Sequence, residues 1–151
     1  MDRRNLMVLF GASVIGMETT SATNSHAQEG KTNTDDMHEN CADACYDCSR
    51  KCTKGFRHCH GKVVGGMKLY EKATVLCNDC SEICLMVAKL VDRRSPLMSI
   101  TCCACAESCE KCIVECEKLN DPEMNAMVES LKKCHRLCEE MAKEMGHNHK
   151  K

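Results

Sequence analysis

The chain has no tryptophan, and aromatic residues make up only 3% of its 151 residues. Beyond the amino-terminal 27 residues the aromatics are Tyr46, Phe56 and Tyr70. Leucine, valine, methionine and cysteine must therefore fill the core. Small thiols in facing layers would leave a tube that is packed less closely than protein interiors normally are. The composition indicates that something other than the protein itself fills this tube.

Charge bias, long apolar runs and catalytic motifs are also lacking. The formal net charge is −1, and acidic and basic residues are interspersed, so nucleic acid is not an expected partner. Past residue 27 no apolar run approaches the roughly 18 residues that a membrane helix needs, which predicts no membrane association once the leader is removed. No serine–histidine–acid or phosphate-loop motif is present, so we expect that the protein is not an enzyme.

The amino terminus has the order of an export signal. Arg3 and Arg4 precede an apolar stretch over residues 6–17, and Ala27 closes a small-x-small cleavage site. We expect residues 1–27 to be a twin-arginine-like signal peptide and the mature protein to be periplasmic. The alternative is a cytoplasmic protein with a disordered amino terminus.

An all-α fold is expected between residues 35 and 145, after a linker over residues 28–34. Helical periodicity runs through this region, and no strand pattern competes with it. Pro96 and Pro122 each follow a capping residue, which is where proline begins a helix. Short connections predict an antiparallel four-helix bundle. The first three expected helices cover residues 35–60, 63–91 or 67–91, and 96–119. The fourth opens at Asn120-Asp121-Pro122-Glu123 and runs to Met145. Gly61, Gly65 and Gly66 mark the first turn, and Gly146 ends the last helix, before a histidine-containing tail over residues 146–151.

Sixteen cysteines recur mostly three or four positions apart along these helices. At about 100° per residue, the five on the first helix fall within an arc of roughly 60°. Cysteine thus takes the stripe where leucine normally lies, and a packed bundle would enclose a column of sulfur. Cys103 lies about 100° off this face and is a doubtful ligand. The predicted metal ligands are Cys41, Cys45, Cys48, Cys52, Cys59, Cys77, Cys80, Cys84, Cys102, Cys105, Cys109, Cys112, Cys116, Cys134 and Cys138.

Three interpretations of these cysteines compete: a disulfide framework, an ordinary core that uses cysteine as a small apolar residue, and a metal site. A short exported chain with more than about 8–10% cysteine is usually a disulfide scaffold, here a disulfide-stapled helical interaction protein. A disulfide requires sulfurs about 2.05 Å apart, however, and pairs one turn apart on a helix meet that only with strain. A metal bound at about 2.3 Å by two thiolates accepts sulfurs roughly 4–5 Å apart. We favour the metal. Packing of cysteine as a small apolar residue does not explain five on one helix.

Ligand softness narrows the metal to copper(I), zinc or iron–sulfur clusters. Zinc normally takes isolated tetrahedral sets, and iron–sulfur clusters favour loop runs that end before proline. An unbroken ladder along helices therefore favours copper(I), with an iron–sulfur electron carrier as the alternative. One copper(I) per thiolate would leave little net charge, which predicts a capacity on the order of a dozen ions.

The cysteine repeats resemble those of the copper storage proteins, a family of cysteine-lined four-helix bundles. The repeats that carry the resemblance are Cys41-x3-Cys45-x2-Cys48-x3-Cys52, Cys77-x2-Cys80-x3-Cys84, Cys102-x2-Cys105-x3-Cys109-x2-Cys112-x3-Cys116 and Cys134-x3-Cys138. The resemblance covers about residues 35–145. It implies storage of many copper(I) ions, assembly as a homotetramer, and membership of an exported branch with a twin-arginine leader. It names neither the copper donor nor the recipient.

The two ends of the bundle are predicted to differ. The first end, where the first and third helices begin, gathers soft ligands that could take up copper: Met37, His38, Met98, Met141 and Met145, with Met86, His147 and His149 nearby. The second end is predicted to be plugged by Val63, Val64, Met67, Tyr70, Met124, Met127 and Leu131. His58 and His60 are expected to face solvent. The His147-x-His149 tail is either unstructured or a surface copper(II) site.

Overall fold

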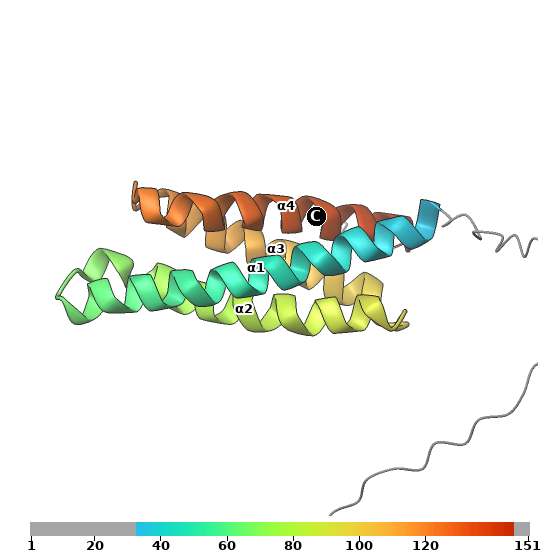
Figure 1. The fold of residues 1–151 in the computed structure, drawn as a ribbon, viewed down its shortest axis with the longest axis horizontal. Helices are drawn as coiled ribbons and strands as arrows, with labels where there is room; N and C mark the ends of the chain where they lie inside the picture. Colours follow the sequence, from blue (N-terminus) through green and yellow to red (C-terminus); the bar gives the residue numbers. More distant parts are fainter. Residues whose placement is uncertain (1–32, 147–151) are drawn as a thin grey trace, which may run out of the picture. The chain divides into compact units, whose positions relative to one another are not determined.

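The computed structural model describes residues 33–146, in which four long helices lie side by side (Figure 1). No strand occurs among these residues, so the prediction of an all-α four-helix bundle is confirmed. No helix in this range is long and apolar enough to cross a bilayer. The predicted leader and the His147-x-His149 tail lie outside the described residues. The helices are α1 Asn33–Val64, α2 Glu71–Asp92, α3 Met98–Glu117 and α4 Asn125–Glu144, and the short 3-10 turns η1 Lys68–Tyr70 and η2 Pro122–Met124 precede α2 and α4.

Each helix packs against two others: α1 and α3 both contact α2 and α4. Neighbouring helices run in opposite directions, because Cys41 early in α1 contacts Cys138 late in α4. Likewise, Cys84 in the second half of α2 contacts Cys105 in the first half of α3. The predicted antiparallel order is therefore confirmed, and with it the two groups of helix ends that form the first end and the second end.

The helix boundaries differ from the predicted ones by a few residues. Helix α1 begins at Asn33, inside the predicted linker, and continues through Gly61 to Val64. Nothing lies within 4 Å of a Cβ placed at Gly61, and glycine at such an exposed position costs a helix only about 1 kcal/mol relative to alanine. The turn follows at Gly66, whose φ of 90° lies in the left-handed region that favours glycine.

Polar contacts between helices lie on the outside of the bundle. Tyr46 donates a hydrogen bond to Asp92 across α1 and α2 at 2.8 Å. Ser130 donates to Asp47 across α4 and α1 at 2.7 Å. Because the polar groups are satisfied at this periphery, the interior faces of all four helices are left to cysteine, methionine and small apolar side chains.

Candidate metal centre

The fifteen cysteines of the predicted stripe all lie inside the bundle. Fourteen have no exposed surface, and Cys116 is 2% exposed. None of the sixteen cysteines, all of which fall within the described residues, forms a disulfide. The structure therefore has the inward-facing sulfur column that the stripe predicts, and it does not favour the disulfide-stapled alternative.

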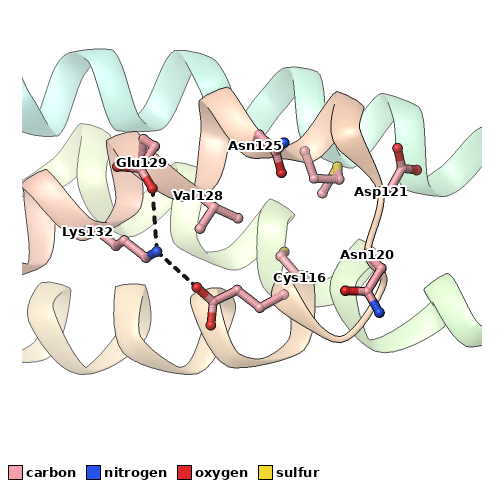
Figure 2. A pocket seen from close by; sticks show the side chains of 9 residues that line it. Cys116, Asn120, Asp121, Asn125, Val128, Glu129 and Lys132 are labelled. Carbon is pink, nitrogen blue, oxygen red and sulfur yellow. Dashed lines mark hydrogen bonds and ion pairs between the residues drawn. The ribbon is translucent and has the colours of Figure 1, made fainter.

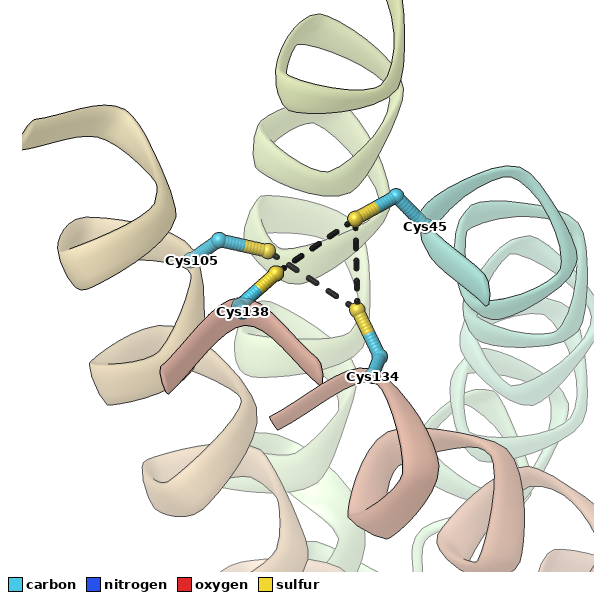
Figure 3. Close-up of side chains that lie close together, drawn as sticks. All are labelled: Cys45, Cys105, Cys134 and Cys138. Carbon is cyan, nitrogen blue, oxygen red and sulfur yellow. Dashed lines mark hydrogen bonds between the residues drawn. The ribbon is translucent and has the colours of Figure 1, made fainter. Parts of the chain in front are cut away.

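Thiols from different helices meet within this column. In Figure 3, Cys45 of α1, Cys105 of α3, and Cys134 and Cys138 of α4 point toward one another. The Sγ atom of Cys45 lies 3.5 Å from that of Cys138 and 3.6 Å from that of Cys134. The Sγ atoms of Cys105 and Cys134 are 3.9 Å apart. All four sulfurs lie within 4.8 Å of one another, a set that a single metal ion can bind.

Similar sets follow one another along the bundle and share members. Cys84 belongs to two sets of four, and Cys80 belongs both to a set of four and to a set of three. Isolated zinc sites each need four ligands of their own, whereas shared thiolates suit ions that are bridged into one cluster. Further sets include Cys48 with Cys80, Cys84 and Cys109; Cys84 with Cys105, Cys109 and Cys134; Cys41 with Cys102 and Cys138; and Cys52 with Cys80 and Cys112.

Thiols one turn apart on the same helix also lie close together. The Sγ atoms are 3.9 Å apart in Cys48 and Cys52, and 3.8 Å apart in Cys80 and Cys84. These separations are slightly shorter than the roughly 4–5 Å expected for sulfurs that share a bound metal. Small side-chain rotations suffice to admit an ion between them.

The thiols perturb one another's protonation. Hydrogen bonds from Cys112 and Cys77 lower the pKa of Cys116 to about 4. Hydrogen bonds with Cys105 and Cys109 hold the pKa of Cys84 well above its usual range. Neighbouring sulfurs therefore share protons, with thiolates accepting hydrogen bonds from thiols. A thiol with a raised pKa is protonated at neutral pH and must lose that proton to bind metal, so metal binding weakens as the pH falls.

Cys103 is buried but lies apart from the column. It is 8% exposed, and it belongs to none of the metal-binding sets named above. Burial, with a further contribution from the nearby carboxylate of Glu139 on α4, raises the pKa of the Cys103 thiol. This placement between α3 and α4 agrees with its position about 100° off the stripe.

The first end brings together only some of the predicted uptake ligands. Met98 and Met141 are 4% and 0% exposed and join the core, and Met37 packs against it. His38 is buried, and its Nδ1 lies 2.6 Å from the carbonyl oxygen of Thr34. Met145 is 46% exposed. Thioethers therefore lie both within the column and at its mouth, and the buried Val87 and Val91 of α2 share this end.

The predicted plug at the second end is wrong in part. Val64 and Met67 are 75% and 48% exposed, because the end of α1 and the turn that follows it lie beyond the column, in solvent. Met124 and Met127 are buried, but their sulfurs face thiols: Met124 Sδ lies 3.9 Å from Cys59 Sγ, and Met127 Sδ lies 3.6 Å from Cys77 Sγ. The column of sulfur atoms therefore extends farther toward the second end than the cysteines alone would take it.

The sequence carried a signal for these thioethers. Met127 lies seven positions before Cys134, and Met124, at the start of the same helix, lies seven positions before Leu131. A spacing of seven keeps residues on one helical face. Sequence reasoning treated both methionines as apolar filler and so missed their contact with the thiols.

His58 is not solvent-exposed as predicted. Its side chain is 17% exposed, and Nε2 lies 2.7 Å from Asp121 Oδ2 while Nδ1 lies 2.9 Å from Glu123 Oε2. The η2 turn, 63 residues away in sequence, brings both carboxylates against the ring. The hydrogen bond with His58 lowers the pKa of Asp121. His60 is exposed, as predicted.

A helical bundle that encloses a continuous column of free thiols defines a class of protein, the thiolate metal-binding bundles. Within this class, the chain belongs to the copper storage protein family, whose sequence pattern matches residues 34–143. The match covers all four helices except the ends of the first and last.

Two similar proteins support this assignment. An uncharacterized cysteine-rich protein, YhjQ of Bacillus subtilis (strain 168), is 31% identical over 104 residues, which is 69% of this chain and 94% of that protein. Among solved structures, the Cu(I)-bound copper storage protein BsCsp3 has a TM-score of 0.64 and 30% sequence identity. That comparison covers 70% of this chain and 98% of the other.

Proposed function

We propose that this protein stores many copper(I) ions on the fifteen thiols of its interior column and performs no catalysis. The observation that carries the proposal is the chain of metal-binding sets with shared members, from Cys41, Cys102 and Cys138 toward the second end. Shared thiolates bind several ions in one continuous cluster. Family membership supports copper(I) as the cargo.

Charge balance favours copper(I) over a divalent ion. A thiolate buried without a counter-charge costs several kcal/mol. A zinc ion held by four thiolates would keep a surplus of two negative charges, whereas one copper(I) per thiolate leaves almost none. A full column therefore holds on the order of a dozen copper(I) ions, by this neutralisation argument.

The proposal is tested by titrating the reduced protein with copper(I) in the presence of a competing chelator. We expect on the order of a dozen ions per chain, bound without visible colour, by the same count of thiolates. Thiol titration of the unloaded, denatured protein without reductant provides the control and should find free thiols. A single bound ion, a brown iron-containing protein or an absence of free thiols would contradict the storage function.

We also propose that Met37, Met141 and Met145 pass copper from the first end to the thiolates within. Thioethers bind copper(I) more weakly than thiolates because they carry no charge, so they suit transfer. Replacing all three with leucine, which is similar in volume, is expected to slow copper(I) uptake in stopped-flow mixing while leaving the final capacity unchanged. Equal uptake rates in the variant and the wild type would end this proposal.

Export through a twin-arginine-like leader is a further proposal, supported by the order of charge and apolar residues over residues 1–27. The mature periplasmic protein should begin at Gln28. Replacing Arg3 and Arg4 with lysine keeps the charge and should leave an uncleaved cytoplasmic chain. Periplasmic recovery of that variant would contradict the twin-arginine route.

Assembly as a homotetramer is proposed from the family resemblance. Exposed apolar side chains on α2 and α3, among them Val75, Met86, Ile100 and Val114, are available for contacts between copies. Light scattering of the purified protein should give four times the mass of one chain. A monomer mass at micromolar concentration would contradict this assembly.

A further inference from the structure

Glycine interrupts the cysteine stripe of α1 at one position. Gly55 lies three residues after Cys52 and four before Cys59, the same spacing that separates the cysteines themselves. A Cβ at Gly55 would collide with the Sδ atom of Met127 and would lie 3.5 Å from Cys77 Sγ. Glycine in a helix interior costs about 1 kcal/mol relative to alanine. Its absent side chain leaves the room that the Met127 thioether fills.

Two thioethers and three thiols come together at this level. Met127 Sδ lies 3.6 Å from Cys77 Sγ, which in turn lies 3.8 Å from Cys116 Sγ. Met124 Sδ lies 3.9 Å from Cys59 Sγ. Met124 and Met127 are 2% and 4% exposed. Soft neutral ligands are thus placed among soft ionisable ones, in a layer whose side chains are almost wholly buried.

A groove leads from the surface to this layer. It has a volume of about 300 Å³, and Cys116 and Met124 form its inner wall. Figure 2 shows Cys116 facing the groove between α3 and α4, with Asn120 and Asp121 at its rim. Lys132 spans the groove, 3.0 Å from Glu117 and 3.4 Å from Glu129. Carboxylates and amides around the mouth of the groove could attract a cation. Movement of the Lys132 side chain would widen the groove.

We propose that Met124 and Met127 are copper(I) ligands, forming with Cys59, Cys77 and Cys116 a mixed thioether–thiolate site at the second end that exchanges copper through this groove. The inference rests on the proposed storage function, because it assigns the last layer of the same column. The second end, which the sequence predicted to be plugged, would then be a second opening for copper, opposite the one at the first end.

The chemistry of the ligands sets the role of this site. A thioether is a soft ligand but supplies no negative charge, so a copper(I) ion that a thioether shares with one thiolate is held less tightly than an ion between two thiolates. Copper in this layer is expected to fill last and to leave first. The second end therefore offers stored copper a route of release, with the thiolate layers between it and the first end as the store.

The ligand assignment is tested by NMR of the full chain carrying ¹³C-methyl methionine, titrated with copper(I). Met→Leu variants assign the methyl resonances. We expect the Met124 and Met127 resonances to shift late in the titration, while that of Met67, which is 48% exposed beyond the same end of the column, stays in place. If copper binds but the two resonances do not move, the assignment is wrong and storage stands. If no copper binds, the storage function fails as well.

The release role is tested with the variants Met124→Leu/Met127→Leu, Gly55→Ala and Met67→Leu, compared by circular dichroism and by copper transfer to a chelator. The double variant should lose the fastest phase of transfer. Gly55→Ala should lose it too, although it removes no sulfur and favours the helix, because the new methyl displaces the Met127 thioether. Met67→Leu should match the wild type. An unchanged fast phase in both test variants would overturn the release role.

Discussion

Replacing Cys84 and Cys134 together with serine is expected to lower the copper(I) capacity by at least about two ions per chain, on the basis of one ion per thiolate. Cys84 Sγ lies 3.6 Å from Cys105 Sγ, 3.8 Å from Cys80 Sγ and 3.9 Å from Cys134 Sγ. Cys134 belongs to the metal-binding set that contains Cys45, Cys84 belongs to the set of four that contains Cys80, and both belong to the set that lies between these two. Serine supplies a hard oxygen that copper(I) binds poorly. Their loss divides the column as well as shortening it.

The measurement is chelator competition on the double variant beside Cys103→Ser as the matched control. Cys103 is buried on the same helix as Cys105 but lies off the column, so its replacement should leave the capacity unchanged. A buried hydroxyl without a partner costs about 1–3 kcal/mol, and the alanine double variant therefore separates lost ligands from lost fold. Wild-type capacity in both folded double variants would contradict the assignment of the column as the store.

Copper(I) loading is expected to raise the thermal unfolding midpoint by on the order of 20 °C. Binding to the native state alone stabilises it by about 4 kcal/mol for one site at roughly 1,000 times the dissociation constant. A domain of this size gains about 4 °C per kcal/mol, so one such site accounts for about 16 °C. Several sites would add further, and binding of copper to thiols of the unfolded chain would subtract from the gain.

Calorimetry or circular dichroism of loaded and unloaded protein measures this difference. The loaded Cys84→Ser/Cys134→Ser variant should gain less than the wild type, and the loaded Cys103→Ser variant should gain as much. An equal midpoint with and without copper would show that the ions do not bind the folded interior.

The interior placement of the thiols could be predicted from the sequence, because it depends only on helical periodicity and on burial of the less polar face. The spacing of Cys41, Cys45, Cys48 and Cys52 determines a shared face whatever the neighbouring helices do. The same reasoning placed Cys103 off that face. Helix existence and antiparallel order followed from proline, glycine and connection length.

The parts that could not be predicted depend on how one helix is positioned along another. Contact between Met127 and the space at Gly55 requires the register of α4 against α1. Contact of His58 with Asp121 requires the path of the η2 turn. Periodicity shows which face of a helix carries a side chain, but not how far along the bundle that side chain lies. The sequence therefore predicted the methionines at the second end to be apolar core residues and His58 to be exposed.

The central claim is that copper(I) occupies the interior column, and anomalous diffraction at the copper absorption edge from crystals of the loaded protein tests it most directly. We expect a row of copper peaks between the helices. It should start at Cys41, Cys102 and Cys138 and end beside Cys59, Cys77 and Met124. Peaks confined to surface histidines, or an interior without copper in crystals that contain it, would contradict the account.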